Sequence, residues 1–126
     1  MNSAKCNDYP ISSCKEYLPQ KKERQVHAAF GKDVTPISKI LGILSDPVRL
    51  HILLALAGQE LCVCVLVEIT DHKYSSLSYH LKLLKEIELV ESMREGTFLL
   101  YRLTERGKAA LDMITNLIEA TGEIQK

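Results

Sequence analysis

The sequence lacks a long hydrophobic run, and it lacks an excess of charge of either sign. No apolar stretch reaches the roughly 18 residues that suggest a membrane span. The opening MNSAKCNDYPISSCKEY has no apolar core of the kind that a signal peptide needs. We therefore expect a cytoplasmic protein with no membrane partner. The 16 basic and 16 acidic residues cancel, which excludes a polycation held on nucleic acid by bulk charge.

Internal repeats, low-complexity tracts and Gly-rich phosphate loops are also missing. The 126 residues suffice for one domain of ordinary size. Because residues 1–17 are polar and aperiodic, we expect them to form a flexible arm, and we expect residues 18–126 to fold as a single domain.

Cysteine is scarce, with four residues: Cys6, Cys14, Cys62 and Cys64. In a reducing compartment these side chains are expected to be thiols available for packing, redox chemistry or metal binding. Cys62 and Cys64 stand one residue apart in the aliphatic segment ELCVCVLVEI. Successive helical residues turn by about 100°, so such a pair can share an ion only where the backbone bends, at a helix start. The helix dipole also favours a thiolate there.

Several segments carry the start and stop signals of helices. A weak helical pattern ends near Gly31, and Thr35 and Asp46 each precede a proline, as an N-cap precedes the first residue of a helix. We expect Gly58 to end the helix that Asp46 caps, and Thr104 to cap the last helix.

The middle of the chain has the order of a winged helix-turn-helix. Two short helices, over residues 63–69 and about 74–87, flank the turn TDHK, and the second has leucines at positions 77, 81 and 84. The next stretch, LVESMREGTFLLYRLT, changes to β-rich runs around Glu95 and Gly96, which predicts a hairpin. We therefore expect a mainly α-helical fold with a small β-hairpin.

The polar side chains between these leucines are expected to face outward and to contact DNA, because hydroxyl and amine groups at a helix start reach base edges and phosphates. The candidate DNA-binding residues are Ser75, Ser76, Ser78, Tyr79 and Lys82, with Arg94, Thr97 and Arg102 in the wing. His80 is a further candidate, although an inward structural histidine fits its position equally well. A solvated amphipathic helix is the alternative interpretation, and the hairpin makes it less favoured.

The last helix has an apolar face, made of Ala110, Leu111, Ile114, Leu117 and Ile118. A monomer of this size would leave part of that face exposed to water. We therefore expect a homodimer that covers it.

ELCVC, followed by SSLSYHLKLLKEIELVESMREGTFLLYRL, resembles the ArsR/SmtB family of winged-helix, metal-responsive repressors. The resemblance extends over roughly residues 35–108. It implies a homodimeric repressor of a resistance or efflux operon. Such a protein binds double-stranded operator DNA when metal-free and releases it when metal binds.

The cysteines resemble those of the cadmium- and lead-sensing CadC branch, in which arm cysteines of one subunit reach the helix pair of the other. This resemblance implies that Cys6, Cys14 or both join Cys62 and Cys64 as metal ligands across the dimer. Four thiolates suit cadmium, lead or zinc, whereas three suit bismuth or trivalent arsenic and antimony. The identity of the inducing ion stays open.

Three positions depart from the family pattern. Val65 replaces the usual acid after CVC, and Val67 replaces a third cysteine found in arsenite sensors. Gly107 stands where a terminal-helix zinc site would have a histidine, so we expect no zinc site there. Three other histidines are expected to be surface or core residues: His27, His51 and His72.

Two other functions would use the same thiols. A redox switch would keep the DNA binding and form a disulfide between the arm and the helix pair, because a Cys62–Cys64 disulfide would close a strained ring. A thiol oxidoreductase is a remoter alternative, since the chain has no cofactor motif.

Overall fold

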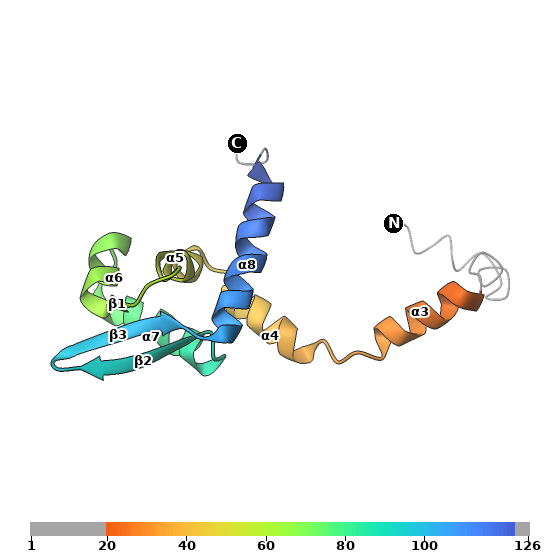
Figure 1. Ribbon diagram of the computed structural model, residues 1–126, viewed down its shortest axis with the longest axis horizontal. Helices are drawn as coiled ribbons and strands as arrows, with labels where there is room; N and C mark the ends of the chain where they lie inside the picture. Colours follow the sequence, from red (N-terminus) through yellow and green to blue (C-terminus); the bar gives the residue numbers. More distant parts are fainter. Residues whose placement is uncertain (1–19, 123–126) are drawn as a thin grey trace. The chain divides into compact units, whose positions relative to one another are not determined.

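The computed structural model describes residues 20–122 and is mainly α-helical, with one small antiparallel sheet (Figure 1). The chain divides into two compact units, Met1–Pro36 and Ile37–Lys126. The predicted boundary after residue 17 lies outside the described residues, as do Cys6 and Cys14, so the arm stays a prediction. Within the described residues, no helix is long and apolar enough to cross a bilayer.

The described part of the first unit consists of one helix and the start of another. Helix α3, Gln20–Phe30, ends just before Gly31, as the sequence predicts. Helix α4, Thr35–Leu44, includes Thr35 itself, and the Asp33 carboxylate accepts a hydrogen bond of 3.0 Å from the Thr35 amide.

The second unit has the element order expected of a winged helix-turn-helix. After α4 come α5 (Pro47–Ala55), β1 (Leu61–Cys62), α6 (Val63–Thr70), α7 (Tyr74–Glu86), β2 (Val90–Glu95), β3 (Phe98–Leu103) and α8 (Glu105–Ala120). The helix-turn-helix is formed by α6 and α7, and the wing is the β2–β3 hairpin.

Two predicted helix caps are confirmed. The Asp46 carboxylate accepts hydrogen bonds from the amides of Val48 at 2.8 Å and Arg49 at 3.3 Å. The Thr104 hydroxyl accepts one from the amide of Gly107 at 3.0 Å. Each cap satisfies amides that the first turn of a helix leaves without a partner in the helix.

The end of α5 was predicted wrongly. Gly58 was expected to stop this helix, but α5 already ends at Ala55. The next residues form tighter turns, as the Ala57 amide bonds the Leu54 carbonyl at 3.2 Å. Gly58 has a left-handed backbone (φ 69°) and belongs to the connection that leads into β1.

The sheet has three strands in the order β1-β3-β2, so the wing has one strand more than the predicted hairpin. The short strand β1 pairs antiparallel with β3, with Leu61 opposite Tyr101 and Cys62 opposite Leu100. Figure 1 shows β1 beside β3 at the entrance to α6. The turn between β2 and β3 contains Gly96 with φ 63°, a conformation that favours glycine.

One hydrophobic core holds the second unit together. Its fully buried side chains come from α5 and the residue after it, from α6 and α7, and from the segment that enters β2. They are Ile52, Leu53, Leu56, Leu66, Leu77, Leu81, Leu84, Leu89 and Val90. This core fixes α7 and the wing on one scaffold.

Candidate functional site

The helix-turn-helix presents one polar face to solvent. Its turn includes Asp71, whose left-handed backbone (φ 54°) ends α6. Helix α7 then buries Leu77, Leu81 and Leu84 in the core. The predicted outward orientation is confirmed, because the other side of α7 exposes Ser75, Ser76, Ser78, Tyr79 and Lys82.

The start of α7 suits a phosphate group. Lys73 occupies the N-cap position, and among the described residues no side chain caps this helix and no acid lies in its first turn. The first amides of a helix carry partial positive charge and lack partners within the helix. Together with Lys73 they make an anion-binding end.

His80 lies on the inner side of α7 and is half-buried. Its Nδ1 accepts a hydrogen bond of 3.0 Å from Nε of Arg49, and Nη1 of Arg49 also donates to the Ile43 carbonyl at 2.9 Å. Burial lowers the pKa of His80, against the opposing charge of Asp46. The structural role left open by the sequence is therefore present, and a DNA contact by His80 stays a prediction.

The wing residues fall into two groups. Arg94 and Thr97 are exposed near the Gly96 turn. Arg102 lies at the other end of β3 and forms ion pairs with Glu91 at 2.7 Å and Glu60 at 3.2 Å. These carboxylates compete with phosphate for its guanidinium. The sequence did not single out Glu60, because its pairing depends on the undetected strand β1. It did not single out Glu91 either, because its place opposite Arg102 depends on the exact register of the hairpin.

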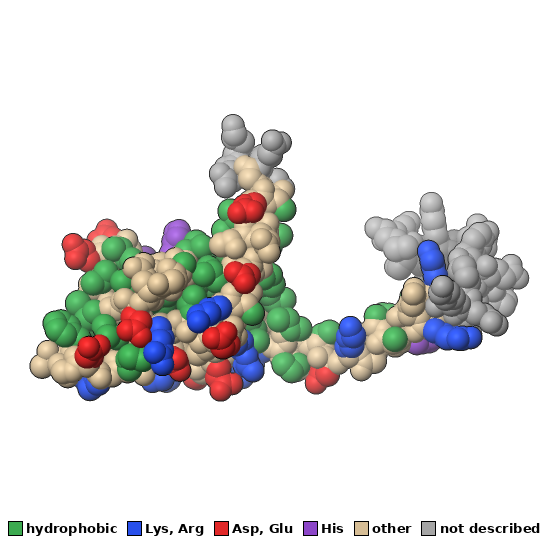
Figure 2. Space-filling view, viewed as in Figure 1, with side chains coloured by type: hydrophobic (Ala, Val, Ile, Leu, Met, Phe, Trp, Pro, Cys, Tyr) green, Lys and Arg blue, Asp and Glu red, His purple; other side chains and the backbone are tan. Residues whose placement is uncertain are grey.

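Charges of both signs cover the surface around the wing. In Figure 2, Asp and Glu side chains alternate with Lys and Arg over the hairpin and the start of α8. Any attraction for DNA on this face therefore depends on local placement of cations rather than on a continuous basic field.

Cys62 and Cys64 lie together at the junction of β1 and α6. Cys62 is both the last residue of β1 and the N-cap of α6, with an extended backbone, and Cys64 is the second residue of the helix. The extended N-cap brings the two side chains to one side, and Cys64 Sγ donates to Cys62 Sγ at 2.8 Å. The expected bend at a helix start is confirmed.

The two thiols differ in acidity. The hydrogen bond from the Cys64 thiol, followed by backbone amides including that of Leu99, lowers the pKa of Cys62. The same side-chain hydrogen bond, together with burial and the Cys62 charge, raises the pKa of Cys64. The pair therefore favours Cys62 as the first thiol to ionise, with its sulfur accepting a hydrogen bond from the Cys64 thiol.

The chemistry of this donor pair fits a soft metal ion. Zinc–sulfur bonds of about 2.3 Å in a tetrahedron separate two sulfurs by about 3.8 Å. Small side-chain rotations would take the pair from 2.8 Å to that spacing. Cys64 is exposed and Cys62 half-buried, so an ion can reach both. Residues 20–122 hold no cluster of three or more metal-binding side chains, so further ligands would have to come from elsewhere.

Comparison with known proteins gives the family. Residues 46–92, which include α5, both thiols and α7, match the family described as bacterial regulatory protein, arsR family. The arsenical resistance operon repressor of Staphylococcus aureus is 43% identical over 82 residues, covering 64% of this chain and 76% of that protein. The chain belongs to the ArsR family.

A second relative of this ArsR-family chain is the cadmium resistance transcriptional regulatory protein CadC of Listeria innocua. It is 39% identical over 70 residues, which cover 55% of this chain and 59% of that protein. These relatives are transcriptional regulators, and the oxidoreductase alternative finds no support among them.

The fold also matches the solved structure of a possible ArsR-family regulator. The homodimeric winged helix-turn-helix DNA-binding domain of a possible ArsR-family regulator from Mycobacterium bovis is 25% identical, with a TM-score of 0.62. It covers 76% of this chain and 94% of that one. The winged helix-turn-helix predicted from the sequence is confirmed.

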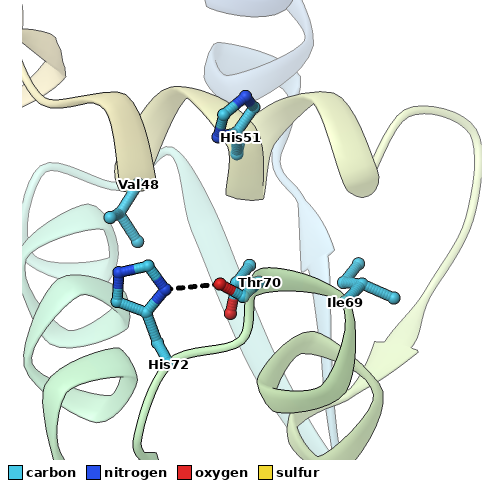
Figure 3. Close-up of a pocket in the computed structure, with 5 residues that line it drawn as sticks. All are labelled: Val48, His51, Ile69, Thr70 and His72. Carbon is cyan, nitrogen blue, oxygen red and sulfur yellow. Dashed lines mark hydrogen bonds between the residues drawn. The ribbon is translucent and has the colours of Figure 1, made fainter.

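A cavity of about 360 Å³ beside the helix-turn-helix is lined by Val48, His51, Ile69, Thr70 and His72 (Figure 3). His72 Nδ1 lies 2.6 Å from the Thr70 carbonyl, and the His51 and His72 rings do not point toward each other. The two imidazoles therefore do not converge on a common point in this cavity.

Proposed function

We propose that this chain is a transcriptional repressor that leaves operator DNA when a soft metal or metalloid ion binds Cys62 and Cys64. The observation that carries the proposal is the 2.8 Å between the two sulfurs at the start of the helix-turn-helix. Membership of the ArsR family supports the DNA-binding half. The arsenical and cadmium resistance regulators among its relatives support the metal response.

The DNA contacts would come from α7 and the tip of the wing. The exposed hydroxyls and Lys82 of α7 would enter the major groove, while the start of the helix binds a backbone phosphate. Arg94 and Thr97 would contact the flanking backbone. Arg102 is the least favoured of the predicted contacts, because Glu60 and Glu91 already neutralise it.

The metal ligands would be Cys62 and Cys64 together with Cys6, Cys14 or both. A soft ion supplies strong bonds to thiolates. Cys62 would present its thiolate first. When the ion binds, Cys64 would lose its thiol proton, which otherwise forms the hydrogen bond to Cys62. Two described thiols are too few for such a site, so the arm would supply at least one more ligand, and resemblance to the CadC branch implies that this ligand would come from the other subunit of a dimer. Cadmium, lead, zinc, bismuth and trivalent arsenic or antimony remain the candidate ions.

The repressor would act as a homodimer in the cytoplasm. A groove of about 550 Å³ lies between α5 and α8, lined in part by Leu50, Leu54 and Ile114. Leu117 and Ile118 on α8 are 60% and 42% exposed, and Figure 2 shows hydrophobic side chains along this helix. A second copy would cover this apolar surface, as two copies associate in the homodimeric structure from Mycobacterium bovis.

The proposal is tested by fluorescence anisotropy of the reduced protein on DNA from its own promoter region. Cadmium, lead, zinc and arsenite are added in turn to the parent, to a Cys62→Ser/Cys64→Ser variant and to a Cys6→Ser/Cys14→Ser variant. We expect an effective ion to weaken DNA binding of the parent by about 5- to 150-fold, the usual range of allosteric coupling. The Cys62→Ser/Cys64→Ser variant should bind DNA and ignore the ion. DNA binding that no ion changes would contradict the metal response.

A redox switch is the second candidate, favoured by the lowered pKa of Cys62, because thiolates react faster with oxidants than thiols do. Anaerobic samples separate the two functions. Metal-driven release without oxygen supports the first candidate. Release by peroxide alone, reversed by a reductant, supports the second.

A further inference from the structure

A row of charged side chains runs from the residue before β1 across β3 to β2. Glu91 of β2 stands directly opposite Arg102 of β3. Continuing the β1–β3 register by one residue places Glu60 opposite Arg102 on the other side. Arg102 bonds Glu91 through Nε at 2.7 Å and Glu60 through Nη1 at 3.2 Å. One guanidinium thus connects the segment before the thiols to both strands of the wing.

The thiol pair is attached to the same central strand. Cys62 stands opposite Leu100, two residues from Arg102, and alternate residues of a strand share one face of the sheet. A displacement of Cys62 therefore acts directly on β3.

Backbone pairing alone attaches β1 weakly. This strand has only two residues, Leu61 and Cys62. Strands of this length are at the lower limit of what a sheet holds. The Glu60–Arg102 ion pair extends the attachment by one residue, and it is the only side-chain ion pair between the β1 segment and the wing among the described residues.

We propose that the Glu60–Arg102 ion pair transmits ligand binding at Cys62 and Cys64 to the wing. Both are then positioning residues, because neither Glu60 nor Arg102 touches the ligand. Glu60 also does not touch DNA. The inference rests on the proposed function, because it assumes that an ion binds the two thiols. It adds the path by which that ion would weaken DNA binding.

The strands offer a matched pair of variants. Glu60→Gln breaks the tie between β1 and β3, and Glu91→Gln breaks the tie between β3 and β2. Both remove one negative charge beside Arg102, so any general gain in DNA affinity is the same for the two. The carboxylates are 42% and 46% exposed, and exposed pairs contribute little to stability, so both variants should fold.

The experiment adds cadmium to the reduced full-length parent and to both variants. Ultraviolet absorption of the cadmium–thiolate bond reports binding, amide hydrogen exchange over residues 90–103 reports the wing, and anisotropy reports DNA. We expect all three proteins to bind cadmium. In Glu60→Gln, cadmium should cause little of the change in amide exchange over the wing that it causes in the parent. The cadmium-induced loss of DNA affinity should be at least about threefold smaller than in the parent, for which the usual range is about 5- to 150-fold. Glu91→Gln should respond as the parent does.

Other outcomes overturn the inference in distinguishable ways. If Glu60→Gln responds as fully as the parent, or if Glu91→Gln loses as much, the ion pair is not the path. If neither cadmium nor any other candidate ion binds a thiol of the parent, the proposed function and the inference fall together. If cadmium binds and changes wing exchange through Glu60 but DNA is retained, the path stands and the repressor function falls.

Discussion

At Gly107, the backbone of a neighbouring segment decides which residue the position can hold. A Cβ atom at this position would overlap the Leu89 carbonyl oxygen, which also accepts a hydrogen bond from the Thr104 amide at 3.1 Å. The start of α8 therefore approaches the segment before β2 too closely for any side chain. A histidine at this position, as a terminal-helix zinc site would need, cannot be accommodated without moving α8.

Gly107→Ala should lower the free energy of unfolding by about 1–3 kcal/mol, because the added methyl group displaces backbone. Urea unfolding followed by circular dichroism measures the change. Gly42→Ala is the control, since a Cβ there meets no atom within 4 Å. Because Gly42 lies in a helix, Gly42→Ala should leave the free energy of unfolding unchanged or raise it by up to about 1 kcal/mol. Equal effects of the two substitutions would show that the close approach to Leu89 is not present in solution.

His80 is a residue whose protonation the fold opposes. Burial lowers its pKa from the ordinary 6.5, and its Nδ1 must be unprotonated to accept the hydrogen bond from Arg49. Since the folded pKa lies below the unfolded one, His80 contributes stability above pH 6.5, and that stability is lost as the pH falls through the folded pKa.

The histidine ring signals in an NMR titration provide the measurement. We expect His80 to titrate below 6.5, and the parent to lose stability over the same interval. His80→Gln removes the titrating group and should flatten this part of the pH profile. A midpoint at or above 6.5 would contradict the buried, Arg49-bonded state.

At the scale of elements, local signals were sufficient for most of the fold. Caps at Asp46 and Thr104 and the leucine spacing of α7 predict helices because the interactions lie within a few residues. Strand β1 was missed because its partner, β3, is far along the chain and its two residues sit in an aliphatic run. The Glu60–Arg102 pair was missed for the same reason.

The candidate site was predictable to a similar extent. Spacing alone indicates that Cys62 and Cys64 meet at a helix start, and periodicity alone indicates which side chains of α7 face outward. Neither shows that Arg49 holds His80 or that Arg102 is held by two carboxylates. The Arg49–His80 and Arg102–Glu60 contacts join elements that are distant in sequence, and the Arg102–Glu91 contact depends on the register of the hairpin, so only the tertiary structure reveals them.

The Asp46 cap gives a prediction for helix α5. Partial burial raises the pKa of Asp46, but the amides of Arg49 and Val48 and nearby positive charges together lower it below 3.8. Asp46→Ala should cost about 1 kcal/mol at neutral pH, and the difference should vanish as the pH falls through the lowered pKa. Urea unfolding at pH 7 and at acid pH measures both effects.

Asp112→Ala, which removes an exposed carboxylate from α8, should change stability by less than about 0.5 kcal/mol. If Asp112→Ala lost as much stability as Asp46→Ala, the effect would come from removing a negative charge in general rather than from losing the cap.

The whole molecule combines an apolar helix face with a neutral net charge. Leu117 lies on the rim of the groove between α5 and α8 and is 60% exposed, an unfavourable position for leucine in a monomer. A repressor that reads two half-sites of an operator would need that face as its contact between copies.

Leu117→Glu should therefore convert the dimer to a monomer and weaken DNA binding, because a charge cannot be buried unpaired in the interface. Sedimentation and DNA anisotropy measure the two effects on the same sample. Asn116→Glu adds the same charge at the adjacent exposed position and should leave both properties unchanged. A Leu117→Glu protein that stays dimeric would place the interface elsewhere.

The short strand β1 also has a mechanical consequence for the wing. The pair Cys62–Leu100 is the last between β1 and β3, so the hairpin beyond it is a two-stranded ribbon anchored at one end. The three residues from Leu100 to Thr97 span about 10 Å at about 3.3 Å per residue. Cys62 thus stands at the pivot of a lever arm. A rotation of about 10° there would carry the tip about 1.7 Å, more than half the length of a hydrogen bond. In the proposed repressor, an adjustment of this size around the two sulfurs would be enough to take Arg94 and Thr97 out of reach of a phosphate.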